Sequence, residues 1–163
     1  MDAKDKQLAE AVLRRLCENS QIGGIRFGPV LQILISHTNR KQDEPIHGQV
    51  YLNLGSRWQV FDSRPLSFPS NEGELAEASP EQQIETLCGL KERTIVKAEL
   101  GEDEPHLVLT LNDGRVLFIN GKHASYECWD IGVAFAEEMW KVVACPGGDL
   151  AIWAPQTFVP ADA

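Results

Sequence analysis

The strongest constraint on the fold is an apolar run that is interrupted once by a tight turn. Residues 107–111 and 116–119 are almost entirely Leu, Val, Ile and Phe, and Asn112-Asp113-Gly114 stands between them. This tripeptide favours a hairpin because its glycine accepts the positive φ that a tight turn needs, while the flanking residues are good β-formers. The segment therefore predicts an antiparallel β-hairpin, and with it a strand-rich fold.

Several other segments have the composition or the alternation of short strands. They are residues 27–35, 50–54, 58–61, 93–100, 142–145 and 150–153. We expect residues 50–61 to form a hairpin around Gly55-Ser56, and residues 142–153 to form another around Pro146-Gly-Gly. Residues 36–47 are polar and are expected to form an exposed loop.

Two helices are expected beside these strands. Residues 3–18 repeat leucine and valine at helical spacing, which predicts an amphipathic helix that packs on a sheet and is ended by residues 19–24. A second helix is expected over residues 79–87, because Ser79 can cap it and Gln82 stands three residues later to complete a capping box.

Together these segments predict an α+β fold, namely an antiparallel sheet built of hairpins with both helices packed on it. The chain has 163 residues, of which 43% are hydrophobic and 24% charged, so we expect residues 1–163 to form a single domain. Residues 1–64 and 79–154 each combine one helix with strands of matching spacing. This repetition suggests an internal pseudo-duplication.

Charge is distributed unevenly along the chain. Up to Arg64 there are nine basic and seven acidic residues, whereas from Pro65 onward there are six and seventeen, which gives the net charge of −9. Such a field favours a basic protein partner and disfavours nucleic acid and anionic membranes, although it can also serve solubility alone. The candidate contacts with a basic partner are Glu72, Glu74 and Glu77 in an acidic loop, and Glu102, Asp103 and Glu104 in a turn.

One short motif is a candidate site for a small molecule. It comprises Tyr126, Glu127, Cys128 and Trp129, with His123 just before it. An indole can desolvate a neighbouring carboxyl and raise its pKa, and a cysteine beside a histidine can act as a nucleophile. The alternative is a structural corner, in which the aromatic rings are buried and Glu127 accepts backbone N–H groups.

The remaining chemistry-bearing residues do not predict a catalytic or metal site. No two of the four cysteines and four histidines have the spacing of two to four residues that zinc ligands favour. Phosphate-binding glycine loops and the hydrolase nucleophile motif are missing from the sequence. We therefore expect no metal, no cofactor and no catalytic residue.

The sequence also indicates a compartment and an assembly. It has neither a signal-peptide pattern at its N-terminus nor an apolar run of the roughly 20 residues that cross a membrane, so we expect a cytoplasmic protein. The four cysteines are too widely spaced to indicate disulfides, and free thiols suit a reducing compartment. Antiparallel sheets usually keep a free edge, which could support a homodimer.

The second half of the chain resembles a family of small uncharacterised bacterial proteins. The resemblance covers residues 86–154 and rests on the Asn-Asp-Gly hairpin, on Tyr126-Glu-x-Trp, and on Pro146-Gly-Gly-x-Leu-Ala-Ile-Trp. The family pattern ends in P-G-G-x-L-A-V-W, so Ile152 replaces Val, and Leu111 stands where the pattern favours Phe. These proteins are similar in length and charge to immunity proteins of bacterial polymorphic toxin systems. The resemblance implies a non-enzymatic protein that binds and neutralises a basic toxin, whereas the alternative is a small enzyme or ligand-binding domain.

Overall fold

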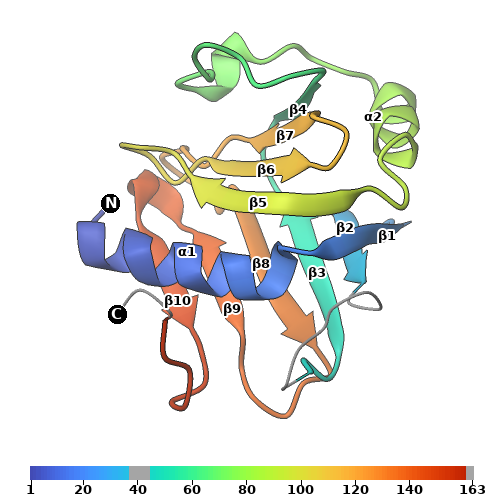
Figure 1. Ribbon diagram of the computed structural model, residues 1–163. Coiled ribbons are helices and arrows are strands. Elements are labelled where there is room, and N and C mark those ends of the chain that lie inside the picture. The colour runs from blue at the N-terminus through green and yellow to red at the C-terminus, as the bar shows by residue number, and fades with distance from the viewer. Residues whose placement is uncertain (37–44, 161–163) are drawn as a thin grey trace.

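The computed structural model describes residues 1–36 and 45–160, which form one antiparallel sheet and two α-helices (Figure 1). The helices are α1 Ala3–Cys17 and α2 Pro80–Cys88, and short 3-10 helices cover Glu72–Glu74 and Pro146–Gly148. The strands are β1 Ser20–Arg26, β2 Leu31–Ser36, β3 Gln49–Leu54, β4 Trp58–Phe61, β5 Thr94–Leu100, β6 Leu107–Leu111, β7 Val116–Ile119, β8 Trp129–Ala134, β9 Lys141–Ala144 and β10 Leu150–Trp153. The predicted α+β class, with its N-terminal and mid-chain helices, is confirmed.

The sheet consists of two sections that meet at a weak junction. The strand order is β10-β9-β8-β3-β2-β1-β5-β6-β7-β4, and β1 pairs with β5 only through Ser20 and Gln21. Figure 1 shows β5, β6, β7 and β4 above this junction, whereas β3, β8 and β9 run in a different direction below it. Because so few residues join the sections, the sheet can bend sharply there and enclose a core between them.

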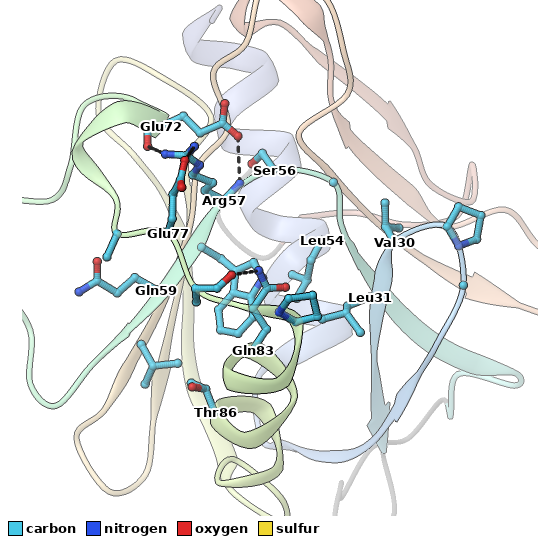
Figure 2. A pocket seen from close by; sticks show the side chains of 18 residues that line it. Val30, Leu31, Leu54, Ser56, Arg57, Gln59, Glu72, Glu77, Gln83 and Thr86 are labelled. Atoms are coloured by element: carbon cyan, nitrogen blue, oxygen red, sulfur yellow. Dashed lines mark hydrogen bonds and ion pairs between the residues drawn. The ribbon is translucent and has the colours of Figure 1, made fainter.

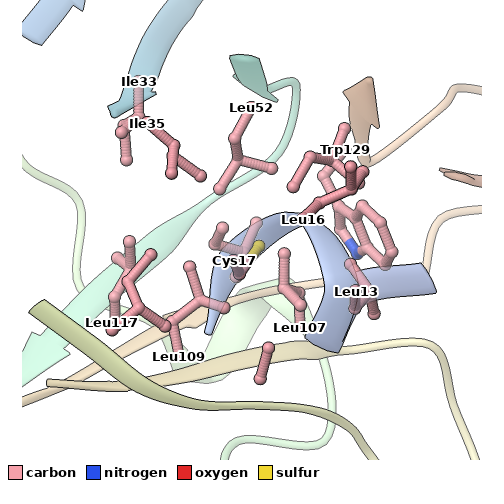
Figure 3. Close-up of a cluster of buried hydrophobic side chains, with 14 of the residues drawn as sticks. Leu13, Leu16, Cys17, Ile33, Ile35, Leu52, Leu107, Leu109, Leu117 and Trp129 are labelled. Carbon is pink, nitrogen blue, oxygen red and sulfur yellow. The ribbon is translucent and has the colours of Figure 1, made fainter. Parts of the chain in front are cut away.

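The larger of two buried clusters receives side chains from α1 and from both sections (Figure 3). Its members include Leu13, Leu16 and Cys17 of α1, Ile33, Leu52 and Trp129 of one section, and Leu107, Leu109 and Leu117 of the other. The apolar face of α1 is therefore enclosed by strands on several sides, which explains why its leucines recur at helical spacing.

Helix α1 also takes the place of a missing strand beside β5. Beyond Ile95 the edge of β5 has no neighbour on the β1 side, and two glutamates of α1 reach it instead. Glu10 accepts a hydrogen bond from the Leu100 N–H at 3.0 Å, and Glu18 accepts one from the Ala98 N–H at 3.1 Å. An unpaired buried N–H is costly, so these carboxylates complete the backbone hydrogen bonding of the edge.

Strand β1 was not predicted, because residues 19–24 were expected only to end the helix. They instead open a strand, and the strand expected over residues 27–35 begins only at Leu31. The glycines of β1 serve close packing. A Cβ on Gly23 would lie 3.2 Å from the Ser36 Cβ, and the pairing with β2 shifts register between Ile22 and Gly24.

The hairpin predicted over residues 50–61 is wrong. Strand β3 pairs with β2 and β8, whereas β4 pairs with β7. By contrast, β6 and β7 do form the predicted hairpin, with Gly114 at φ +89° in its turn. The matching spacing of the two halves is therefore not accompanied by matching strand pairing, which weakens the case for a duplication.

Strand β8 was not predicted either. It begins at Trp129, where only a structural corner was expected. Its Gly132 lies against Tyr51 of β3, and a Cβ at that position would be 2.8 Å from the Tyr51 hydroxyl oxygen. The glycine therefore allows β8 to insert beside β3. Of the loop expected over residues 36–47, residues 37–44 lie outside the described part of the chain.

The α1–β5 contact leads to a first prediction. The Glu10→Ala variant should lower the free energy of unfolding by about 1–3 kcal/mol, because the Leu100 N–H loses its acceptor. The Glu10→Gln variant keeps an acceptor oxygen and should lose less. Urea unfolding followed by circular dichroism measures both, and equal losses would show that the hydrogen bond is unimportant.

Candidate functional site

A cavity of about 910 Å³ opens between β4, α2 and the turn that precedes β2 (Figure 2). We call it the α2–β4 cavity. Its volume lies in the range of sites that bind small molecules or short peptide segments. It is lined by residues 28–31, residues 54–60, Glu72, residues 76–78, and Pro80, Gln83 and Thr86 of α2.

The first wall is the edge of β4. Three consecutive residues of this strand, Trp58, Gln59 and Val60, line the cavity. Consecutive side chains of a strand point to opposite faces, so a cavity that touches all three must lie along the edge of the strand. Strand β4 is the last strand in the sheet order, and within residues 1–36 and 45–160 no strand other than β7 pairs with it.

The second wall is α2, which begins where its sequence predicts. Ser79 and Gln82 form a capping box, with hydrogen bonds of 2.9 and 3.2 Å, and Leu87 anchors the helix in the core. Pro80, Gln83 and Thr86 are three residues apart and so share the face that lines the cavity. This face presents small and polar side chains to the opposite strand.

Charged side chains gather at one end of the cavity. Figure 2 shows Arg57 held between Glu72 and Glu77, with Val30 and Leu31 on the opposite side. The Arg57 Nη2 lies 2.5 Å from Glu77 Oε1, and the Arg57 backbone N–H donates to Glu72 Oε1 at 3.1 Å. The Arg57–Glu77 pair is largely exposed, so it contributes little to stability.

Glu72 also accepts a hydrogen bond from a residue outside the cavity lining. The Tyr126 hydroxyl lies 2.7 Å from both carboxylate oxygens of Glu72 and donates to this group. Burial, and then this hydrogen bond, raise the pKa of Tyr126 above its ordinary value. The ring of Tyr126 stacks on His123, with 3.6 Å between the ring centroids. Tyr126 thus fixes the position of a carboxylate in the cavity wall without itself lining the cavity.

The six predicted acidic contacts do not form one set. Glu72 and Glu77 line the cavity, whereas Glu74 is exposed on the 3-10 helix and accepts hydrogen bonds from Ser70, which lower the pKa of Glu74. The other three, Glu102, Asp103 and Glu104, lie in the turn between β5 and β6 and do not line the cavity, and Glu104 pairs with Lys122.

The alternative site around Tyr126 is only partly accessible. Cys128 and Trp129 are fully buried, and the Trp129 indole N–H donates to the Pro105 carbonyl at 2.8 Å. Glu127 is exposed, and none of these residues lines the α2–β4 cavity. Burial raises the pKa of the Cys128 thiol to about 11, which leaves it protonated and poorly nucleophilic near neutral pH.

The cavity lining offers groups suited to recognition. Among the residues that the structure describes, no group of three or more His, Cys, Asp or Glu side chains could hold a metal ion. The lining combines two carboxylates, a guanidinium, two amides, two hydroxyls and apolar side chains with the edge of a strand. Such an arrangement can bind through charge, hydrogen bonds and apolar contact.

Sequence reasoning missed Trp58, Val60, Gln83 and Thr86 as site residues. It identified the strand and most of the helix that carry them, but it paired that strand with β3. The capping box of α2 does indicate which residues share a helical face. Nothing local indicates that this face lies opposite the edge of β4.

Comparison with known proteins adds no relative. No protein-family model, curated protein or solved structure matches the chain. The resemblance to an uncharacterised bacterial family therefore stays a prediction. Within the described residues, none of the helices has both the length and the apolar character that a bilayer span requires.

The burial of Cys128 leads to a second prediction. Cys88 is exposed, so it should react rapidly with a disulfide reagent such as DTNB in the native protein, whereas Cys128 should react only after unfolding. The Cys88→Ser variant should lack the rapid phase, and peptide mass mapping identifies the labelled sites. Rapid labelling of Cys128 at neutral pH would instead support an accessible nucleophile.

Proposed function

We propose that this chain is a non-enzymatic binding protein that holds a basic polypeptide in the α2–β4 cavity. One observation carries the proposal. The α2 side of the cavity is built from the segment 65–90, which contains neither lysine nor arginine and places Glu72 and Glu77 in the lining. Fixed negative charge along one wall attracts a basic partner and repels an acidic one.

The charges around the cavity support a net negative site. Among its described lining residues Arg57 is the one cation, and Glu72 and Glu77 outnumber it. Glu81 and Glu85 add two exposed carboxylates on the solvent face of α2, opposite the lining face, where they act only at longer range. Charges arranged in this way increase the association rate of a basic partner and exclude partners of like charge. Their effect on affinity is smaller.

The more specific proposal is an immunity-type protein that neutralises a basic toxin in the cytoplasm. Its support is the resemblance of residues 86–154, together with an acidic surface that complements the basic clefts of toxins that act on nucleic acid. The cysteines are free, which suits a reducing compartment. An enzyme site around Tyr126 has less support, because Cys128 and Trp129 belong to the core.

A third prediction tests the basic partner. A display library of random ten-residue peptides, panned on the protein, should become enriched in lysine and arginine, and added salt should weaken binding of the selected peptides. The Glu77→Lys variant should weaken their binding about tenfold or more, because Glu77 lines the cavity. The control is Glu102→Lys/Asp103→Lys, which adds twice as much charge in the β5–β6 turn and should nevertheless have a much smaller effect.

Two results would contradict this prediction. Selected peptides without an excess of basic residues would remove the charge argument. Basic peptides that are weakened mainly by the Glu102→Lys/Asp103→Lys change would move the site from the α2–β4 cavity to the turn.

A fourth prediction tests neutralisation. Expression of the protein encoded by the neighbouring gene in a heterologous host should arrest growth, and co-expression of this chain should restore it. The Glu77→Lys variant should restore growth poorly at equal expression, because the toxin is then bound less tightly. If the neighbouring product is harmless, or remains toxic in the presence of the wild-type chain, the immunity proposal is wrong.

A further inference from the structure

We infer that the basic partner binds as an extended segment that adds a further strand to the sheet at the free edge of β4. This inference rests on the proposed function, and it adds the mode of binding. An added strand bonds through its main chain, while pockets beside the edge select alternate side chains. Two features of β4 carry the inference, namely the direction of its backbone groups and its position along the cavity.

The hydrogen bonding of β7 determines which backbone groups of β4 are free. The Asn120 N–H donates to the Arg57 carbonyl at 3.0 Å. In an antiparallel pair every second residue bonds to the same neighbour, so Gln59 and Phe61 continue this pattern toward β7. The N–H and C=O groups of Trp58 and Val60 therefore point the other way.

The opposite edge of β7 supports this assignment. In the β6–β7 hairpin the Leu111 N–H donates to the Arg115 carbonyl at 2.9 Å. The same alternation then directs Leu117 and Ile119 toward β6, which leaves Phe118 to bond with β4. Phe118 is the partner of Gln59, so both ladders give the same result.

The free groups of Trp58 and Val60 face a space that could hold another chain. Both residues line the α2–β4 cavity, and across it α2 presents Gln83 and Thr86 rather than a strand. A row of unpaired N–H and C=O groups at a sheet edge is a template for a further strand. The cavity provides room for such a strand between β4 and the helix.

The lining also indicates a side-chain pattern for the added strand. Its side chains would alternate between two directions. The apolar residues Val30 and Leu31 lie on one side of the lining, and the carboxylates of Glu72 and Glu77 lie on another. We therefore expect the bound segment to alternate apolar residues with lysine or arginine.

Charge favours this occupant over a second copy of the chain. Pairing of β4 with its own equivalent would be isologous and would bring two copies of the acidic segment 65–90 together. Each copy carries a net charge of −9, so the two segments would repel each other. A basic segment gains from the same charges.

A fifth prediction concerns amide hydrogen exchange, measured by NMR with a basic peptide selected from the random library. Saturating peptide should slow exchange of the Trp58 and Val60 amides about tenfold or more, because both N–H groups become bonded. The Gln59 amide already faces β7 and serves as the internal control, with little change. Unchanged exchange at Trp58 and Val60 in the bound state would overturn the inference.

Matched variants test the same bonds independently. The Val60→Pro variant removes the outward N–H and is compatible with an edge strand, whereas Val60→Ala shortens the side chain but keeps the N–H. Peptide binding should be at least about tenfold weaker for Val60→Pro than for Val60→Ala. If Val60→Pro does not fold, peptides that are N-methylated at alternate amides give the same information. Methylation of the amides that face β4 should abolish binding, whereas methylation of the other amides should not.

The outcomes separate this inference from the proposed function. If basic peptides bind and the Glu77→Lys variant weakens their binding, but neither amide exchange nor N-methylation has an effect, strand addition is wrong and the proposed function stands. If no basic peptide is enriched, both are wrong. The protein can also be tested for self-association without peptide. If it self-associates, and Val60→Pro but not Val60→Ala abolishes this, a second copy of the chain occupies the edge and the inference is overturned.

Discussion

The arrangement of the whole chain depends on the backbone groups of β5 that have no strand beside them. Helix α1 satisfies them with Glu10 and Glu18 and at the same time contributes Leu13 and Leu16 to the core. This double contact holds the four-strand section over the other strands although β1 and β5 barely pair. The section therefore has one edge closed by a helix and, at β4, one edge left open to a cavity.

The two sides of that cavity contribute different interactions to binding. The segment before α2 carries charge through Glu72 and Glu77, and charge acts over a distance and selects partners by sign. The edge of β4 carries directional groups that act only on contact and require an extended backbone. Tyr126 links the site to the body of the fold, because it holds Glu72 in place while Cys128 and Trp129 beside it are core residues.

Features set by neighbours in sequence were predictable, and features set by remote contacts were not. The 107–119 hairpin, α1 and the capped start of α2 follow from local patterns. The glycines of β1 and β8 looked like breaks, because their function depends on Ser36 and Tyr51, which come from other strands. Glu72 and Glu77 were identified from charge alone. Trp58 and Val60 were missed because an edge is defined only by the strand order.

The strand order also has a consequence during synthesis. Strand β3 lies in the interior of the sheet, between β2 and β8. Its neighbour β8 comes from a segment 77 residues further along the chain, as the contact between Asn53 and Asp130 illustrates. At about 5–20 residues per second, a ribosome needs roughly 4–15 s to translate that interval. Throughout this period the nascent chain exposes an apolar strand with an open side. Cotranslational protection by a chaperone would therefore matter most between the emergence of β3 and that of β8.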